Sequence, residues 1–387
     1  MKLNNKIIYF MILSYILLSL FDIVWKYTIL IILFVYILIN ILHLKPLKNI
    51  DTIEEPSTFP LVSIIIPAWN EEGTIKRSIL NILKSTYTNF ELIVIAGGED
   101  KTFELADDLS KKDKRIKAIK QEPLGKSAAL NKGLKHKQGE IVIFLDADSL
   151  VDENWLNYLV KPIINKEANI TVADFKPYIE NWVTTWYSLY HSYLRYVTDK
   201  KGFFGGSTAF ESAVFDNGIV LDDKVIADDY YLNIQCADKY KIKFVKDSVV
   251  RTDIPGTFAG FLTNGVRWVR ILLHTTLLYN NKRKNVLFTL LNATYFTSGL
   301  PVSLLLYYII GNKASFIFLE VWFIYFSLVI LLNVIKPLAL YRIDGNGKWL
   351  KYGWVALVFP IFVYLVYFYA MLTYKKVTPF FKGSRKF

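Results

Sequence analysis

The sequence predicts an α/β protein, in which a doubly wound, mainly parallel sheet domain is flanked by transmembrane helices. In the middle of the chain, short apolar runs of strand length alternate with helical segments, as in a parallel sheet with crossover helices. Apolar stretches of about 18 residues stand at both ends, close to the ~20 residues that cross a bilayer. The chain has 387 residues, of which 53% are apolar, more than an ordinary soluble domain carries.

The first predicted strand covers residues 61–66, a short β-branched run that we expect to end at Pro67. Asn70 is then expected to cap a helix over residues 71–84, whose first turn carries the acids that a helix N-terminus favours. A second strand over residues 91–95 ends at a pair of glycines. The pattern therefore begins as strand, helix, strand.

The alternation continues with a helix over 101–111, a strand over 115–119, a helix over 127–137, a strand over 140–145 and a helix near 155–161. No Gly-x-Gly-x-x-Gly follows the first strand, and no Walker-type loop occurs in the sequence. This argues against a dinucleotide-binding domain and against a P-loop domain.

Two carboxylates stand at the end of the strand over 140–145. The run from 140 to 149 reads EIVIFLDADS, which places Asp146 and Asp148 at the edge of the sheet where ligands bind. Such a pair suits a hard divalent cation, which usually comes with phosphate oxygens. The alternative is that Asp148 or Asp152 only caps the next helix.

Two later segments carry glycines or acids that could serve the same site. Gly205 and Gly206 lie beside aromatic residues and either let the backbone approach a ligand or only form a turn. Asp228 and Asp229 lead into an expected helix, either as part of a site or as its cap. Taken singly, these segments leave both interpretations open.

Residues 258–273 have the pattern of an amphipathic helix that lies at a membrane surface. Asn264, Arg267, Trp268 and Arg270 stand there among apolar residues. Arg267 and Trp268 are equally compatible with anchoring at the interface and with a catalytic role.

The apolar stretches divide the chain into five expected parts. These are a transmembrane hairpin over 1–48, a globular domain over 60–256, an amphipathic interfacial segment over 257–285, a transmembrane bundle over 286–374 and a basic tail over 375–387. The hairpin has candidate spans over 7–25 and 27–44, and the bundle has candidate spans over 286–310, 316–335 and 355–374. No small-residue cleavage site follows the first span, which favours a hairpin over a signal peptide.

The formal net charge is +12, and the basic residues cluster beside the apolar spans. This favours anionic membrane lipids as partners over nucleic acid. The same residues place the globular domain in the cytoplasm, on an integral protein of the cell membrane. Three C-terminal spans would put the tail outside, although the tail and the loop over 336–351 are both basic. Either one apolar segment is re-entrant or interfacial, or the charge rule fails here.

The single cysteine, Cys236, excludes an internal disulfide.

The order of five motifs resembles that of the family 2 glycosyltransferases, in particular the membrane-integrated members. These include synthases of hyaluronan, cellulose and chitin type and relatives that form glycolipids. The motifs read VSIIIPAWNEE over 62–72, GKSAALN over 125–131, FLDADS over 144–149, DDYYL over 228–232 and VRW over 266–268. The resemblance runs from residue 61 to about residue 270 and, more loosely, through the flanking spans.

The resemblance implies a GT-A-like fold and an inverting transfer from a nucleotide-diphosphate sugar, a UDP-sugar first of all, to a polysaccharide or lipid. It implies Mg²⁺ or Mn²⁺ on Asp148 with Asp146 close by, and Asp229 as the base beside Asp228. It also implies that Arg267 stabilises the leaving diphosphate. Donor-binding positions by the same resemblance are Pro67, Asn70, Glu71, Glu99, Asp100, Lys126, Asp146 and Asp148, and acceptor-binding positions are Gly205, Gly206 and Trp268.

The chain departs from the family pattern at three places. The usual Asp-Asp-Gly turn is absent from residues 95–100, so recognition of the base falls to the backbone, Glu99 or Asp100. The acidic pair begins with Asp228 where Glu is usual, and Asn264 replaces the Gln or Arg of processive members. The alternative function is therefore a non-catalytic scaffold that binds a sugar nucleotide or acts as the partner subunit of a synthase.

Overall fold

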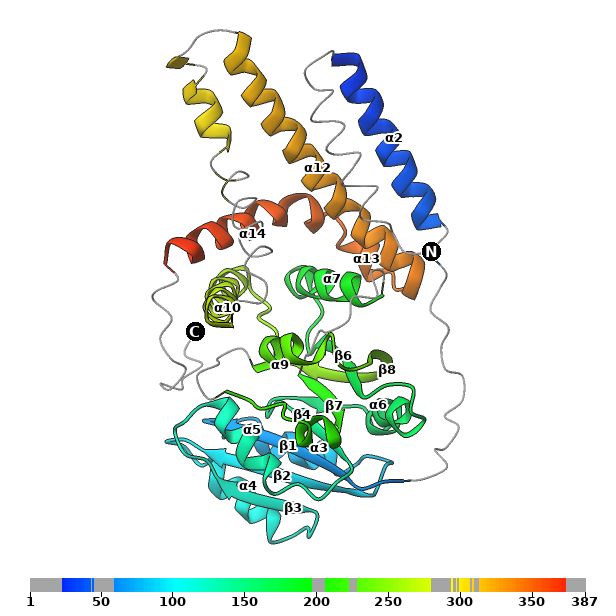
Figure 1. Cartoon of the computed structure of the whole chain (residues 1–387), viewed down its shortest axis with the longest axis vertical. Helices are drawn as coiled ribbons and strands as arrows, with labels where there is room; N and C mark the ends of the chain where they lie inside the picture. Colours follow the sequence, from blue (N-terminus) through cyan, green and yellow to red (C-terminus); the bar gives the residue numbers. More distant parts are fainter. Residues whose placement is uncertain are drawn as a thin grey trace.

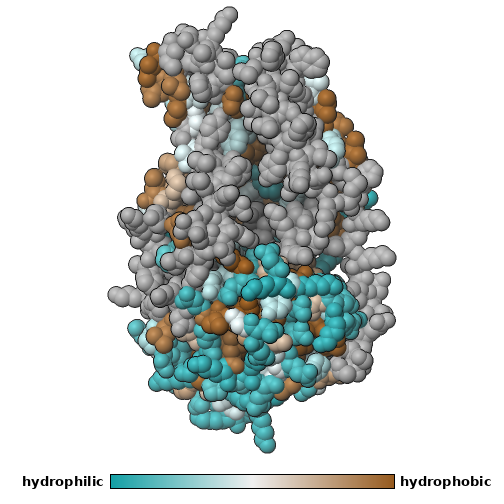
Figure 2. Space-filling view, viewed as in Figure 1, coloured by the Kyte–Doolittle hydropathy of each residue, from teal (hydrophilic) through white to brown (hydrophobic). Residues whose placement is uncertain are grey.

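The computed structural model describes residues 23–42, 44, 59–196, 206–222, 228–279, 294, 297, 299–306, 308–309 and 313–373. A sheet domain forms one end of the molecule, and α2 (Ile23–Leu42) and α12 (Lys313–Asp344) stand upright at the other end (Figure 1). Hydrophilic residues gather over the sheet domain, and brown hydrophobic patches lie on the helical half (Figure 2). Of the predicted spans, 7–25 lies outside the described residues apart from 23–25, most of 286–310 lies outside them, and so does the tail over 375–387.

The sheet has eight strands in the order β3-β2-β1-β4-β7-β6-β8-β5. The strands are β1 (Val62–Trp69), β2 (Phe90–Gly97), β3 (Ile116–Lys120), β4 (Ile141–Leu145), β5 (Leu150–Val151), β6 (Ile170–Pro177), β7 (Ser207–Glu211) and β8 (Ile242–Thr252). Strands β3, β2, β1 and β4 are mutually parallel, as are β6 and β8, whereas β7 is antiparallel to β4 and β6, and β5 is antiparallel to β8. The prediction of a mainly parallel α/β sheet is confirmed.

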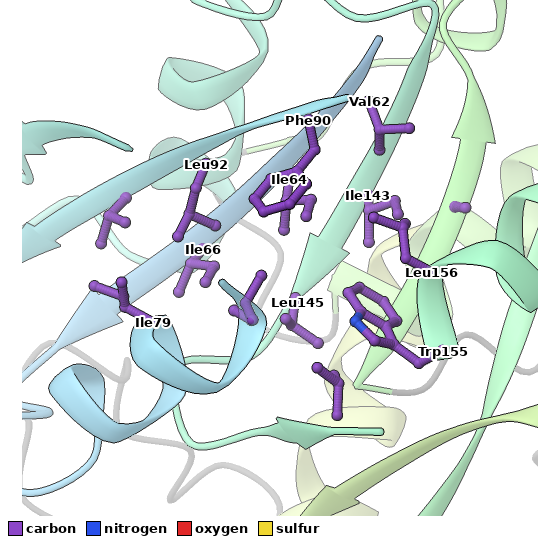
Figure 3. Packing of buried hydrophobic residues seen from close by; sticks show 14 of the residues in the cluster. Val62, Ile64, Ile66, Ile79, Phe90, Leu92, Ile143, Leu145, Trp155 and Leu156 are labelled. Carbon is purple, nitrogen blue, oxygen red and sulfur yellow. The ribbon is translucent and has the colours of Figure 1, made fainter. Parts of the chain in front are cut away.

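Helices cover both faces of the sheet because successive residues of a buried strand point to opposite sides. Ile64 and Ile66 pack into a core with residues of α3 (Ile75–Ile82), α4 (Thr102–Ser110) and α6 (Trp155–Ile164). Figure 3 shows this face, where Trp155 and Leu156 of α6 meet the strands. Ile65 packs on the opposite face with residues of α5 (Lys126–Leu134), α8 (Ala213–Asp216) and α9 (Asp228–Cys236). The sheet is therefore doubly wound.

Two expectations about the end of β1 were wrong. Pro67 does not end the strand but lies within β1, in register with Ile95 of β2. The β1–β4 ladder stops at Ile65, so β1 is paired only with β2 beyond that point, where a proline is tolerated. Asn70 does not cap the helix, because α3 begins only at Ile75.

A layer of three helices separates the sheet from the upright helices: α7 (Trp182–Tyr196), α10 (Phe258–Tyr279) and α14 (Val355–Leu372). Trp186 and Leu189 of α7 form one apolar cluster with Phe359 of α14. The same cluster holds Trp349 of the short helix α13 (Lys348–Lys351) and Leu340 of α12. Ile37 and Ile41 of α2, Leu328, Ile335 and Ala339 of α12 make a second cluster, which joins the two upright helices.

Helix α14 packs along α10 over most of its length. Phe258 and Phe261 of α10 contact Phe359 near one end of α14, and Arg270 donates to the Thr373 hydroxyl at 2.6 Å just past the other end. In Figure 1, α14 lies across the molecule above α10, whereas α2 and α12 stand upright. Two described segments are long and apolar enough to cross a membrane, Leu319–Asp344 and Val355–Leu372, and only the first of them stands upright in this way.

Candidate active site

The candidate site lies where the strand order changes direction. Strand β1 has β2 on one side and β4 on the other, and all three are parallel. Their carboxyl ends therefore open onto a common edge, where open α/β sheets bind ligands. Asn70 follows β1, Glu99 follows β2, and Asp146 follows β4.

Three carboxylates meet one lysine at this edge. The Lys126 ammonium lies 2.8 Å from Asp146 Oδ1 and 3.1 Å from Asp228 Oδ2, and the charge of Asp229 also acts on it. We call Asp146, Asp228 and Asp229 the acid cluster. Desolvation alone would lower the pKa of Lys126, but the acid cluster outweighs it and holds that pKa well above its usual value. The lysine is therefore a cation at every physiological pH.

The backbone before Lys126 sets its position. Gly125 has φ +94°, which favours glycine, and α5 begins directly at Lys126. This turn brings the start of α5, on one face of the sheet, to the carboxyl edge of β4. The sequence predicted a contact between Lys126 and the donor but not its double ion pair.

Gly206 lies beside the acid cluster. Its carbonyl accepts the Asp146 N–H at 3.2 Å, and a Cβ built on it would stand 3.2 Å from Asp146 Oδ2. A side chain here would crowd the carboxylate, so the glycine leaves room around Asp146. The structure thus brings Gly206 to an acid that was expected to bind the donor. Gly205, its predicted companion, lies outside the described residues.

Asp148 is turned inward, and its side chain is only 5% exposed. The Thr252 hydroxyl lies 3.4 Å from Asp148 Oδ2, and the Tyr178 hydroxyl donates to the Asp148 carbonyl oxygen. Among the described residues, no three His, Cys, Asp or Glu side chains are arranged to hold a metal ion. The role of Asp148 as a metal ligand therefore stays a prediction.

Asp229, at the start of α9, has a raised pKa. Desolvation and the neighbouring charge of Asp228 raise the pKa of Asp229 from 3.8 to about 7, although Lys126 acts in the opposite direction. The Tyr230 N–H donates to Asp229 Oδ1 at 2.7 Å and holds the carboxylate at the start of α9. A carboxylate with this pKa suits proton transfer at neutral pH.

Tyr187 of α7 packs against Phe175 and His191 and is affected by charges on other elements. Burial raises the pKa of Tyr187 to about 12; the charge of Asp229 adds to the shift, and the charges of Arg195 and Arg267 oppose it. Sequence reasoning missed this residue. Tyr187 stands in an aromatic-rich helix where nothing in the local pattern distinguishes it from its neighbours.

Arg267 and Trp268 are held on α10. Arg267 Nη2 donates to Asn264 Oδ1 at 2.7 Å, one turn earlier on the helix, and its guanidinium lies 5.8 Å from the centroid of the Trp268 ring. Trp268 is 39% exposed, which leaves part of its ring accessible. Asn264, the departure from the family pattern, therefore fixes the orientation of the arginine.

The loops after β1 and β2 are tied together by the predicted donor-binding residues. Asn70, with φ +56°, accepts the Glu99 N–H through Oδ1 at 2.7 Å, which is why it is not a helix cap. Asp100 accepts the backbone N–H groups of Glu72 and Thr102 at 3.1 and 3.0 Å.

The acids of these loops differ in how far they are used within the protein. Glu71 Oε2 accepts the Thr74 hydroxyl at 2.6 Å, so Glu71, like Asp100, serves the loop itself. Glu99 remains an exposed acid at the carboxyl end of β2.

Two family sequence models match this chain. The model described as glycosyl transferase family 2 matches residues 63–215, and the model described as glycosyl transferase family group 2 matches residues 141–374, more than half of the chain. Together they cover the sheet domain, α10 and the helices that follow.

Curated relatives are similar over parts of their length. Glycosyltransferase GlyA of Streptococcus pneumoniae is 32% identical over 121 residues, 31% of this chain and 17% of that protein. The probable glycosyltransferase YdaM of Bacillus subtilis is 26% identical over 261 residues, 61% of this chain and 62% of that protein. The chain thus spans less than two thirds of the length of these relatives.

A solved structure extends the likeness to the fold. The mannosyltransferase PcManGT of Pyrobaculum calidifontis, solved in complex with GDP-Man and Mn²⁺, has a TM-score of 0.54 and 18% identity, covering 90% of this chain and 95% of that one. This likeness, together with the mixed sheet, confirms the GT-A-like fold. Since a family model covers more than half of the chain, the protein belongs to the family 2 glycosyltransferases.

Proposed function

We propose that this glycosyltransferase moves a sugar, with inversion, from a nucleotide-diphosphate donor to a polysaccharide or lipid acceptor at the cell membrane. One observation carries the proposal. Lys126 and the acid cluster come together at the carboxyl edge between β1 and β4, and one acid of the cluster, Asp229, has a pKa near 7. These are the charges that such a transfer needs: a carboxylate to take a proton as the base, and positive charge to stabilise a diphosphate.

The donor is proposed to lie across the ends of β1, β2 and β4. Its diphosphate meets the ammonium of Lys126, which stands at the start of α5. The nucleobase of the donor lies over the loops after β1 and β2, where the exposed Glu99 stands. A UDP-sugar is the first donor to test, and GDP-mannose is the second because the archaeal structure contains it.

The residues of the site fit a divalent cation. Mg²⁺ is commonly held by one or two carboxylates together with substrate phosphates. Of the two predicted ligands, Asp146 stands in the acid cluster, where it and Asp228 already converge on one cation, the ammonium of Lys126. Asp148, two residues along the chain, stays the other predicted ligand. When bound, Mg²⁺ or Mn²⁺ supplies positive charge that stabilises the departing diphosphate.

The proposed transfer is a single displacement. Asp229 takes the proton of the acceptor hydroxyl while the acceptor oxygen bonds to the anomeric carbon. The bond between that carbon and the diphosphate oxygen breaks, and its electron pair leaves with the nucleotide diphosphate. Arg267 stabilises the added charge, and its bond to Asn264 keeps the guanidinium in place. The accessible part of the Trp268 ring offers an apolar wall to the acceptor.

The membrane arrangement is proposed from the helical layer. The contacts at both ends of α14, to Phe258 and Phe261 and to Arg270, support a helix that lies at the membrane surface beside α10 and does not cross. The basic loop over 336–351 and the basic tail would then share one side with the catalytic domain, as the positive-inside tendency requires.

Single-cysteine labelling tests this arrangement, because Cys236 is the one cysteine of the chain. In a Cys236→Ala background, cysteines placed at Gly347 and at Ser384 should both react with an impermeant maleimide from the cytoplasmic side. Labelling of the two positions from opposite sides would show that α14 crosses the membrane.

The proposed function itself is tested by nucleotide release. Purified protein in nanodiscs receives Mn²⁺ and UDP-, GDP- or dTDP-sugars, with and without cellular lipid extract. Turnover with one donor identifies it, and dependence on lipid identifies a lipid acceptor. Nucleotide binding without turnover across the panel would favour the alternative of a non-catalytic scaffold.

A further inference from the structure

We propose that Lys126 is the resident cation of the acid cluster in the donor-free enzyme and that it competes with the divalent cation for Asp146 and Asp228. When donor and metal bind, the lysine leaves the carboxylates and its ammonium moves to the diphosphate. This inference rests on the proposed function for the identity of the ligands.

The first argument is geometric. The ammonium lies within ion-pair distance of one oxygen of Asp146 and one oxygen of Asp228, at 2.8 and 3.1 Å. Asp146 is a predicted metal ligand and Asp228 stands beside it, so the ammonium and a metal ion bound to Asp146 need the same space. Both are cations, and at such separations their repulsion is several kcal/mol even at an effective dielectric of about 20. They cannot share the position.

The second argument concerns charge. With Lys126 removed, Asp146, Asp228 and Asp229 would stand close together with no cation between them. Like charges this close together repel one another. A resident cation offsets this repulsion until the donor arrives.

The third argument is that the lysine is able to move. Its side chain is 43% exposed despite its two ion pairs, and it stands at the first residue of α5. A lysine ammonium is a compact charge on a flexible stem, which suits exchange between partners. A permanently structural ion pair would instead be expected to lie deep in the core, as Asp174 and Arg195 do with 3% exposure each.

The experiment measures Mn²⁺ binding to the full-length protein without nucleotide, by the electron paramagnetic resonance signal of free Mn²⁺. Lys126→Met should bind Mn²⁺ at least tenfold more tightly than the wild type, because the competing cation is gone. Lys126→Arg, which retains the charge, should bind it as weakly as the wild type. Lys135→Met, an exposed lysine at the other end of α5, is the matched control and should change nothing.

A second measurement tests whether the Lys126 ammonium binds the diphosphate of the donor. Affinity for UDP and GDP in EDTA should fall at least tenfold in Lys126→Met, because the diphosphate loses the ammonium that receives it. Thermal unfolding verifies that each variant is folded, and Lys126→Gln replaces Lys126→Met if the methionine variant is not.

Unchanged Mn²⁺ affinity in the folded neutral variants would overturn the inference, whether or not the enzyme transfers sugar. Tighter Mn²⁺ binding with unchanged nucleotide affinity would overturn the move to the diphosphate and leave only the competition. If Lys126→Met binds Mn²⁺ more tightly but the wild type releases nucleotide from none of the donors, the inference is supported and the proposed function is refuted.

Discussion

Asp229→Asn separates the chemistry of the site from its stability. The substitution replaces an acid whose pKa is about 7 with a neutral side chain of the same shape, so it removes the proposed base without opening a cavity. Transfer should fall by about 10² to 10⁴-fold, the usual contribution of a general base. Donor binding should persist, since Lys126 and Asp146 are unchanged.

The same substitution should stabilise the protein at neutral and alkaline pH. A carboxyl whose pKa is 3.8 unfolded and about 7 folded binds more protons when folded, so it lowers stability as the pH rises between those values. The shift corresponds to a penalty of at most about 4 kcal/mol above pH 7. Asp229→Asn removes that penalty, and its gain in stability should grow from pH 4 to pH 7 and then level off.

Both effects are measured on the same purified variants. Donor turnover is followed by nucleotide release, and stability is followed by thermal unfolding at pH 5, 6, 7 and 8. Asp238→Asn, an exposed acid in the turn after α9, is the control and should alter neither quantity. Wild-type turnover should rise as the pH increases through about 7. Normal turnover by Asp229→Asn, or a stability gain that is larger at pH 5 than at pH 8, would refute the reasoning.

Three further substitutions have distinct expected outcomes. Gly206→Ala should lower turnover about tenfold with little change in melting temperature, because its Cβ would stand 3.2 Å from Asp146 Oδ2; a wild-type rate would show that the carboxylate has room to spare. Gly98→Ala should destabilise the fold by about 1–3 kcal/mol in thermal unfolding, because its φ is +129° and a Cβ would meet Asn70 Oδ1; an unchanged melting temperature would contradict this. Arg267→Ala should lower kcat more than it raises KM in steady-state assays, whereas a change in KM alone would assign Arg267 to ground-state binding.

Much of the fold could be read from the sequence because its signals are local. Predicted strands over 91–95, 115–119 and 140–145 correspond to β2, β3 and β4, each within two residues at either end. β-Branched runs of that length pack well in a parallel sheet wherever they fall in the chain. The error at Pro67 arose because the sequence does not reveal where the neighbouring ladder ends, and only that ending makes a proline acceptable in β1.

The site was predictable only in part, for a similar reason. Asp146 follows a strand, and its place at the ligand-binding edge of the sheet follows from that strand alone. Asn70 was misassigned because its side chain had two possible partners. The backbone of its own helix and the loop after β2 compete for it, and the close approach of β1 and β2 decides for the Glu99 N–H.

By itself, the sequence determined the α/β class, the order of the motifs and the family, since all three depend on the identity and spacing of residues along the chain. Tertiary structure decided what those residues do to one another. Lys126 meets Asp228 across 102 positions of the chain, the charge of Asp229 raises the pKa of Tyr187, and α14 packs along α10 although its composition is that of a spanning helix. Such relations depend on how distant segments pack, because the direction of a side chain and the pKa it acquires are set by neighbours that local periodicity does not specify.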